Sequence, residues 1–186
     1  TPIKSSAASD VYKRQEYIKN QVRDIVDFPT KGVVFKDLTT VLKNAEALKM
    51  ISDELYDRYK NSGITKVVGI ESRGFILASI VAYKLNAGFV PIRKPGKLPA
   101  LTWSESYNKE YGSDTIEIHQ DAISEDDVIL LHDDVLATGG TMVAAYHLLK
   151  KFNPKHIYIN FLTEIVMLNG RKDFPVDVEI NSMIKL

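Results

Sequence analysis

Apolar residues recur along the chain with two spacings, one typical of helices and the other of strands. Between residues 46 and 60 they return every three or four positions, with Asn44 placed as an N-terminal cap and Gly63 as a stop, which predicts an amphipathic helix. Other helical patterns cover residues 75–85, ending at Asn86 and Gly88, and residues 142–152. Short apolar runs bounded by turn residues predict strands at 67–70, 89–92, 128–131 and 157–162.

The predicted strands alternate with the predicted helices, which is typical of an α/β protein whose parallel sheet is covered by helices on both faces. Two further strands are expected, at Thr115–His119, where polar and apolar residues alternate, and at the last edge of the sheet, Val176–Ile180. Between Arg93 and Gly112 the pattern lapses into a polar stretch with prolines. Connections of this length are usually functional lids or disordered loops.

The first residues of the chain do not share this pattern. Thr1–Gln15 is rich in serine and alanine and has no periodic apolar face. We interpret residues 1–15 as a disordered arm or an artefact of the expressed chain, whose removal should leave activity nearly unchanged. Residues 16–186 are then expected to form a single domain, the default for this length.

The composition of the chain excludes several kinds of site and partner but does not indicate a function. The chain has 186 residues, of which 45% are hydrophobic and 26% charged, as in an ordinary soluble protein. Lysine plus arginine equals aspartate plus glutamate at 24 each, so no overall field attracts nucleic acid or an anionic membrane, and any anion needs a local site. The absence of cysteine excludes disulfides, thiolate metal sites and a cysteine nucleophile. With no membrane-span or signal-peptide pattern, we expect a cytoplasmic protein.

The stretch from residue 128 to residue 141 is the most informative part of the chain. An apolar strand runs into Asp133 and Asp134, and these acids are followed by a small-residue loop and the start of a helix. In an open parallel sheet, ligands bind at the carboxyl ends of the strands. The neighbouring carboxylates suit the vicinal hydroxyls of a ribose, and we expect both to lie outside the core. His132 is expected to be a satisfied strand-end histidine rather than a catalytic base.

The loop that follows has the features of a phosphate site. Glycines let the backbone close around a phosphate, threonine hydroxyls can donate hydrogen bonds, and the helix start adds unpaired N–H groups and a positive dipole end. The candidate phosphate-binding residues are Ala137, Thr138, Gly139, Gly140 and Thr141. A nucleoside triphosphate loop would need a lysine after the glycines, where this chain has Thr141 and Met142. A helix cap beside two solvated acids is the alternative without a ligand.

Together the acids and the loop resemble the signature with which type I phosphoribosyltransferases bind 5-phosphoribosyl-1-pyrophosphate (PRPP). In that family the two acids hold the ribose hydroxyls and the loop cradles the 5′-phosphate, which implies a catalytic role for Asp133 and Asp134. The resemblance also implies the type I phosphoribosyltransferase fold, an α/β fold with a parallel-sheet core, helices on both faces, a small hood and a flexible lid loop at about residues 93–114.

Three other segments resemble adenine phosphoribosyltransferases in particular, and with the signature they cover nearly everything from about Asp27 to Gly170. One of them, residues 69–75, is again a turn between a strand and a helix, and its match in the family binds pyrophosphate. The resemblance implies that Ser72 and Arg73 are the binding residues, with Arg73 also catalytic, since a guanidinium can take two phosphate oxygens at once. A solvated surface arginine is the alternative.

A second segment, residues 27–37, is similar to the base-binding segment of the family. The resemblance implies that adenine lies against the apolar side chains of Val34 and Phe35, while main-chain groups near Val34 and Lys36 read its amidine edge. Ile165, where leucine is often found, would close the pocket from the other side. A proline-glycine turn with packed side chains, and a core isoleucine, are the alternatives.

The third segment is the long polar stretch with the IEIHQDA run after it, and it resembles the lid that separates adenine enzymes from hypoxanthine, orotate and uracil enzymes. The resemblance implies that Arg93, Lys94, Lys97 and Tyr111 bind pyrophosphate. Glu110 and Tyr111 would swing over the reacting centre, and Glu110 is the candidate for handling the adenine proton, because a closed site can raise the pKa of a carboxyl. An exposed charged loop is the alternative.

The implied reaction joins adenine to PRPP to give AMP and pyrophosphate in purine salvage. The resemblance further implies Mg²⁺ bound with PRPP and pyrophosphate, with no dedicated metal site, and a homodimer that binds neither nucleic acid nor membrane. Another purine phosphoribosyltransferase, for hypoxanthine, guanine or xanthine, is the alternative enzyme. A PRPP-sensing regulator is the alternative of another class, and it would need a basic face or an added DNA-binding domain.

Overall fold

The structure is a computed structural model that describes residues 3–108 and 112–186. The chain forms two compact units, Thr1–Glu54 and Leu55–Leu186, which divide inside helix α3 (Ala45–Tyr59). This division differs from the single unit expected for residues 16–186, although their action as one catalytic domain stays a prediction. Among the described residues, none of the helices has both the length and the apolar character that a membrane span requires.

The first unit begins with a helix where the sequence pattern predicted disorder. Helix α1 (Ile3–Lys19) covers the serine- and alanine-rich stretch. Alanine has the highest helix propensity, so such a stretch can be helical without an apolar face. The side chains of residues 9–14 are exposed, in agreement with the missing face. Whether residues 1–15 are an arm or an artefact of the expressed chain, and whether they are dispensable, stay predictions.

A small hairpin follows α1, formed by β1 (Arg23–Val26) and β2 (Val34–Asp37). Arg23 and Asp37 stand opposite each other in the register, and Arg23 Nε donates to Asp37 Oδ2 at 3.0 Å. Asp37 also accepts from the hydroxyl and the main-chain N–H of Thr39, which begins α2 (Thr39–Leu42). The Thr39 hydroxyl, then Arg23, lower the pKa of Asp37 to about 2, so this carboxylate stays charged and joins hairpin to helix.

The second unit is built on a five-stranded sheet in the order β4-β3-β7-β8-β9, in which every neighbouring pair is parallel. Its strands are β3 (Lys66–Ile70), β4 (Gly88–Ile92), β7 (Val128–Leu136), β8 (His156–Glu164) and β9 (Ile180–Lys185). The helices are α4 (Gly74–Leu85), α5 (Gly140–Lys150) and the short 3₁₀ helix η1 (Val166–Leu168). The predicted parallel sheet and the strand–helix alternation are confirmed.

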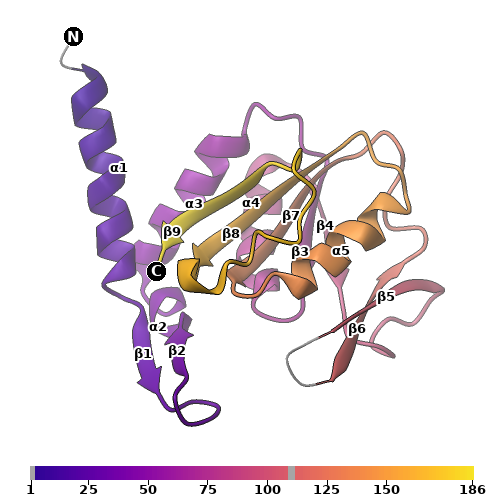
Figure 1. Cartoon of the computed structure of the whole chain (residues 1–186). Helices are drawn as coiled ribbons and strands as arrows, with labels where there is room; N and C mark the ends of the chain where they lie inside the picture. The colour runs from indigo at the N-terminus through magenta and orange to yellow at the C-terminus, as the bar shows by residue number, and fades with distance from the viewer. Residues whose placement is uncertain (1–2, 109–111) are drawn as a thin grey trace. The chain divides into compact units, whose positions relative to one another are not determined.

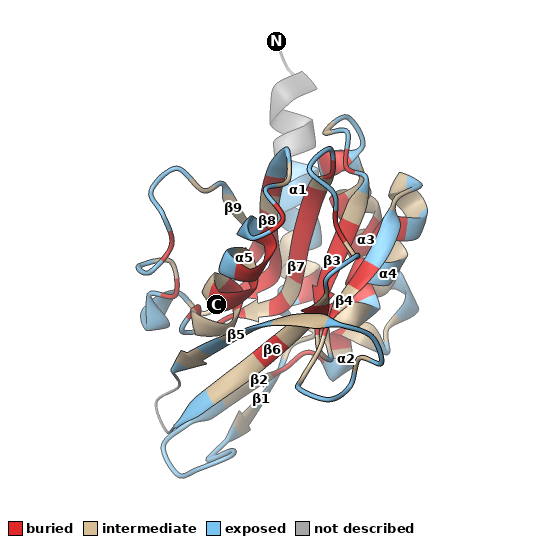
Figure 2. Cartoon of the chain, turned by 90° about the vertical axis from the view of Figure 1, so that its right-hand side faces the viewer, coloured by how far each residue is buried: buried red, intermediate tan, exposed pale blue. Residues whose placement is uncertain are grey.

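Helices cover both faces of this sheet, as expected (Figure 1). A Cβ built on Gly69 of β3 would lie 2.9 Å from Cβ of Ala78, so this position faces α4. Side chains alternate along a strand. The neighbouring Val68 and Ile70 accordingly join the buried cluster that includes Ala144 of α5. Figure 2 shows the central strands β3 and β7 as buried.

A hairpin replaces much of the predicted loop between residues 93 and 112. Strand β5 (Thr102–Asn108) pairs with β6 (Ser113–His119), and only the second had been predicted. Trp103 and Tyr107 are half-buried, whereas Ser104 and Ser106 are exposed, so β5 also follows the period of two. The Trp103 ring lies 4.5 Å from that of Phe152. Polar residues on both faces of β5 hid this alternation.

The last edge strand lies later in the chain than predicted. Strand β9 spans Ile180–Lys185 and pairs with β8 from Ile159↔Ile180 to Glu164↔Lys185. Val176, where the expected strand began, is fully exposed. The buried residues of the true strand are Met183 and Ile184. An edge strand was correctly expected, but its position was wrong, because a short apolar run does not distinguish an exposed turn from an edge strand.

His132 is a buried residue inside β7 and not at a strand end. Its side chain is 2% exposed, and Nδ1 lies 2.9 Å from Oδ1 of Asn160, its neighbour in the β7–β8 register. Nε2 has no hydrogen bond within the part of the chain that the structure describes. Burial lowers the pKa of His132 to about 4, so the ring is neutral and structural at neutral pH.

This burial predicts a loss of stability in weak acid. The unfolded chain protonates His132 near pH 6.5, whereas the folded chain does so near pH 4. Below pH 6.5 the unfolded state therefore binds more protons, and lowering the pH from 7 to 5 should cost about 2 kcal/mol from this residue. Urea unfolding of wild type and His132→Asn at both pH values measures the difference. Equal pH dependence in the two proteins would contradict the assignment.

Candidate functional site

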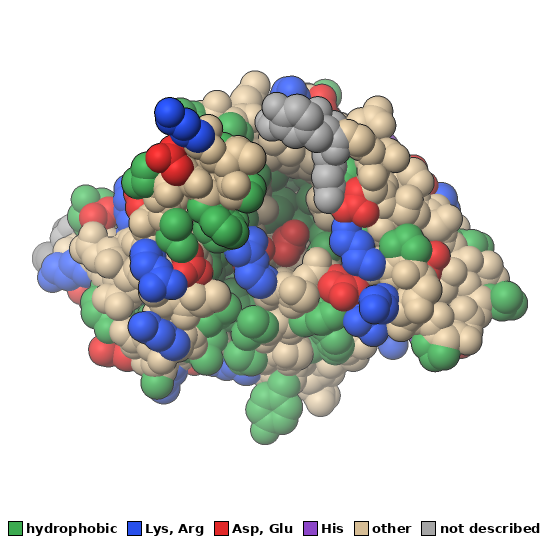
Figure 3. Space-filling model, turned by 90° about the horizontal axis from the view of Figure 1, so that it is seen from below, with side chains coloured by type: hydrophobic (Ala, Val, Ile, Leu, Met, Phe, Trp, Pro, Cys, Tyr) green, Lys and Arg blue, Asp and Glu red, His purple; other side chains and the backbone are tan. Residues whose placement is uncertain are grey.

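A cavity of about 290 Å³ lies at the carboxyl ends of β3 and β7. This is the edge of a parallel sheet at which ligands bind. In the view of Figure 3, acidic and basic side chains lie close together near the centre of the face that is shown. The residues lining the cavity are Ile70, Glu71, Ser72, Arg73, Lys94, Tyr107, Asp133, Asp134 and Thr141.

The two predicted acids lie in the last part of β7, because the strand continues past them to Leu136. Asp133 is half-buried and Asp134 is only 5% exposed, which corrects the expectation that both lie outside the core. Oδ2 of Asp134 forms an ion pair with Nε of Arg73 at 2.7 Å. The hydroxyl of Thr163 donates to the main-chain oxygen of Asp134 at 3.1 Å. Asp134 is thus held both by Thr163 of the neighbouring strand β8 and by Arg73 of the turn before α4.

Burial sets the protonation of the acid pair. It raises the pKa of Asp133 well above the usual range, and the charge of Asp134 raises it further. Burial also raises the pKa of Asp134, while the charge of Arg73 opposes this rise. Both shifts disfavour the doubly charged form of the pair, and the charge of Arg73 only partly offsets this effect. Such a site favours ligands that donate hydrogen bonds or bring positive charge to the carboxylates.

The turn that carries Arg73 approaches the acid pair through a glycine. A Cβ built on Gly74, the first residue of α4, would lie 2.9 Å from Oδ1 of Asp133 and 3.1 Å from the main-chain oxygen of His132. No side chain fits there without a shift. Gly74 therefore lets the turn with Ser72 and Arg73 lie against the end of β7.

Of the three basic residues predicted in the lid loop, Arg93, Lys94 and Lys97, only Lys94 is among the cavity-lining residues of the described chain. Arg93 instead donates through Nε to Glu71 Oε2 at 3.3 Å and through Nη1 to the main-chain oxygen of Lys97 at 3.2 Å. The side chain of Lys97 is exposed. Glu71 also accepts from the main-chain N–H of Lys94 at 2.9 Å, and this bond is the main cause that keeps the pKa of Glu71 low.

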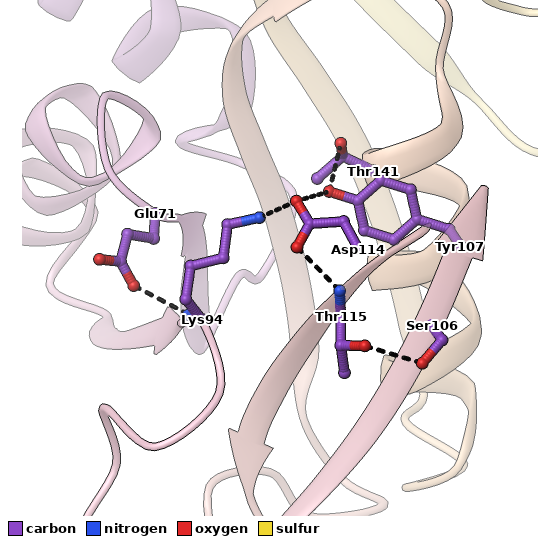
Figure 4. A network of polar contacts seen from close by, with 7 residues as sticks. All are labelled: Glu71, Lys94, Ser106, Tyr107, Asp114, Thr115 and Thr141. Carbon is purple, nitrogen blue, oxygen red and sulfur yellow. Dashed lines mark hydrogen bonds and ion pairs between the residues drawn. The ribbon is translucent and has the colours of Figure 1, made fainter. Parts of the chain in front are cut away.

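A polar network crosses the cavity from Lys94 to the start of α5 (Figure 4). Nζ of Lys94 pairs with Asp114, which also accepts a hydrogen bond of 3.3 Å from the hydroxyl of Tyr107. The hydroxyl of Thr141 donates to the Tyr107 oxygen at 3.0 Å. Sequence reasoning missed Glu71 and Asp114, and gave Tyr107 no part in the site. Only the β5–β6 register, in which Tyr107 faces Asp114, brings these groups together.

The predicted phosphate loop (Ala137–Thr141) lines a smaller cavity of about 80 Å³ next to the first. Gly139 has φ +89 and is the N-cap of α5, with no side chain capping the helix. A positive φ of this size favours glycine. Asp133 and Thr141 line both cavities, so the acids and the loop belong to one continuous site.

The residues predicted to bind adenine are divided between the two units. In the first unit, Val34 is 47% exposed, the Phe35 ring packs edge-on to Phe28 at 5.2 Å, and Lys36 Nζ pairs with an acid at 2.7 Å. In the second unit, Ile165 is half-buried, and its N–H donates to the main-chain oxygen of Leu136 at 2.9 Å.

Two predictions fall outside the described residues. Glu110, the candidate for proton transfer, and Tyr111, a candidate for pyrophosphate binding, belong to residues 109–111, for which the structure gives no placement. Within residues 3–108 and 112–186, no group of three or more histidine, cysteine, aspartate or glutamate side chains could hold a metal ion.

Comparison with known proteins identifies relatives over nearly the whole chain. A family model described as a phosphoribosyl transferase domain matches residues 37–173. An adenine phosphoribosyltransferase from Bacteroides fragilis is 55% identical over 178 residues, which is 95% of this chain and 99% of that protein. These matches confirm the resemblance that the sequence motifs indicated.

Solved structures agree with this relationship. The adenine phosphoribosyltransferase from Rhodothermus marinus has a TM-score of 0.88 at 46% identity, over 94% of this chain and 99% of that chain. The enzyme from Giardia lamblia, complexed with 9-deazaadenine, has a TM-score of 0.86 at 46% identity, over 91% and 96% of the two chains. The expected fold is therefore confirmed.

Proposed function

Since the chain belongs to the adenine phosphoribosyltransferase family, we propose that it transfers the phosphoribosyl group of PRPP to adenine, forming AMP and pyrophosphate in purine salvage. The observation that carries this proposal is a single site in which two acids at the end of β7 adjoin a glycine-rich phosphate loop on one side and Arg73 and Lys94 on the other. This arrangement fits the ribose, the 5′-phosphate and the pyrophosphate of PRPP.

Asp133 and Asp134 would hold the ribose hydroxyls. Transfer at the anomeric carbon passes through an oxocarbenium-like state, so positive charge develops on the ribose as pyrophosphate leaves. Hydrogen bonds from the ribose hydroxyls to the acids would strengthen as this charge develops, and would thus stabilise this state more than the ground state. No covalent intermediate is needed. The main task of the protein is to hold the reactants in line and to offset charge.

The phosphate loop would bind the 5′-phosphate, and Ser72, Arg73 and Lys94 would bind the pyrophosphate. The loop lies at the N-terminus of α5, where unpaired N–H groups and the helix dipole favour an anion. Arg73 is already paired with Asp134, so it lies between the proposed leaving group and the proposed ribose contacts. Arg93, Lys97 and Tyr111 remain candidates for further pyrophosphate contacts.

Adenine would lie against Val34 and Phe35, with main-chain groups near Lys36 reading its edge and Ile165 closing the pocket. The relative from Giardia lamblia was solved with 9-deazaadenine, an analogue of this base, which supports adenine over a 6-oxo purine. Glu110 stays the candidate for handling the adenine proton.

Mg²⁺ fits the chemistry of the acid pair, since it is a hard cation that takes carboxylate and phosphate oxygens and keeps part of its water shell. Burial raises the pKa of both acids and so disfavours their charged forms, which a nearby cation would stabilise. The oxygens of PRPP and pyrophosphate would supply most of its ligands near Asp133 and Asp134, so no dedicated metal site is proposed. When bound, it neutralises the charge that develops on pyrophosphate. The resemblance further predicts a homodimer, and the cytoplasmic location expected from the sequence pattern stays a prediction.

The base specificity is tested with adenine, hypoxanthine, guanine and xanthine, each with PRPP and Mg²⁺. We expect adenine to give the highest kcat/KM, measured by loss of base and appearance of pyrophosphate. Faster turnover of any 6-oxo purine would replace the proposed substrate while leaving the family unchanged.

Arg73→Ala should impair pyrophosphate handling more than adenine binding, since the proposed partner of Arg73 is the leaving group. We expect a rise in the KM for PRPP and weaker inhibition by pyrophosphate, with little change in the KM for adenine. Arg58→Ala, which removes an exposed arginine of α3, is the matched control. If only the KM for adenine changed, the pyrophosphate site would have to be placed elsewhere.

Replacing Asp133 and Asp134 together by Asn should lower kcat/KM for PRPP by on the order of a hundredfold, because hydrogen bonds to charged groups contribute about 1.5 to 3 kcal/mol each. The fold should survive, since Asn keeps the size of both side chains and can still accept hydrogen bonds. Asp126→Asn, at an exposed acid, is the control. A folded double variant with unaltered PRPP kinetics would remove the main support for this function.

A further inference from the structure

The phosphate loop is packed, backbone to backbone, against a glycine far along the chain. A Cβ built on Gly170 would lie 2.2 Å from the main-chain oxygen of Ala137 and 2.9 Å from Cδ1 of Leu136. Conversely, a Cβ built on Gly139 would lie 2.1 Å from the main-chain oxygen of Gly170. Real Cβ atoms do not approach other atoms this closely, so Gly170 fits against the loop only because both contact points lack side chains.

The segment that presents Gly170, residues 165–171, is fixed at both ends, and we call it the brace. At its start, the N–H of Ile165 donates to the main-chain oxygen of Leu136 at 2.9 Å. At its end, Arg171 donates to both carboxylate oxygens of Glu164, through Nε at 2.8 Å and Nη2 at 2.6 Å. Nη1 of Arg171 also donates to the main-chain oxygen of Ile180 at 3.0 Å. Such a two-bond pair fixes orientation as well as distance.

The ion pair that closes the brace is largely removed from solvent on its acidic side. Glu164 is 6% exposed, and the hydrogen bonds from Arg171 keep the pKa of its carboxyl low. Glu164 therefore stays ionised at neutral pH. A charged, bidentate contact beside the sheet gives the brace a defined position that η1, with its exposed side chains, does not provide.

The phosphate loop needs an external support of this kind. Gly139 and Gly140 give its backbone more conformational freedom than other residues would, and no side chain caps the start of α5. An anion site made of main-chain N–H groups binds well only when those groups already point to one place.

We propose that Gly170, held by the Glu164–Arg171 pair, is a positioning residue for the phosphate loop and thus for the phosphate end of the substrate, an inference that rests on the proposed function. Gly170 contacts no substrate in this scheme. It acts through Ala137 and Gly139, on which its backbone lies. The affinity for a phosphate monoester such as ribose 5-phosphate should therefore depend on the brace. The affinity for pyrophosphate, which we propose binds at Ser72 and Arg73, should not.

The test is calorimetric titration of ribose 5-phosphate and of pyrophosphate into the full chain. Gly170→Ala places a methyl group against the Ala137 carbonyl and should weaken ribose 5-phosphate binding at least tenfold, while pyrophosphate binding changes less than twofold. Gly88→Ala is the matched control, since its new Cβ would meet only the flexible side chain of Lys66. Thermal melting separates these effects from a general loss of stability.

A second variant keeps the inference testable if Gly170→Ala does not fold. Arg171→Lys retains the charge but not the bidentate contact, and it should weaken ribose 5-phosphate binding selectively. Ser182→Ala removes single bonds to Arg171 and Glu164 but keeps the bidentate pair between them, and it should not weaken this binding. Equal losses for both ligands, or none in a folded variant, would overturn the inference. Failure of the wild-type chain to bind ribose 5-phosphate would instead overturn the proposed function.

Discussion

The parallel pairing of β3 with β7 is the constraint on which the candidate site depends. Their register, in which Gly69 faces His132, brings the ends of both strands to the same edge of the sheet. The turn after β3 then lies beside the acids of β7, and Gly74 makes that approach close enough for Arg73 to reach Asp134. Neither half of the site is complete alone. A shift in this register would move Arg73 away from Asp134, even if each residue kept its local conformation.

Burial of charge follows from the same geometry. Because β7 continues past the acids, Asp134 is enclosed by protein and its charge is only partly offset by Arg73. Burying an incompletely paired charge costs free energy. The site is therefore less stable than an apolar packing of the same volume would be, and a ligand that supplies hydroxyl donors or a cation relieves this cost. At the acid pair, the same burial that lowers the stability of the free protein favours the binding of such a ligand.

The sequence predicted those features that depend on neighbours in the chain, such as the sheet strands, the Asn44 cap, which receives two N–H groups, and the acids with their loop. It failed where contacts join distant residues. The role of Asp114 depends on the β5–β6 register and that of Gly170 on a backbone contact with residues 137–139. Arg93 was expected at the cavity, but the residue that binds it, Glu71, carries no local signal. The periodicity of apolar residues predicts individual helices and strands, but it does not predict which distant residues contact the ends of those elements.

The contact between Lys94 and Asp114 has a consequence for how ligands compete. Lys94 already has an anionic partner within the chain, so an incoming pyrophosphate would exchange one anion for another at its ammonium group. The affinity gained at Lys94 is then only the difference between two contacts. The carboxylate released by this exchange is bonded to Tyr107, whose oxygen accepts the Thr141 hydroxyl at the start of α5. The ammonium group of Lys94 is therefore held, before any ligand arrives, by a chain of polar contacts that ends at Thr141 of α5.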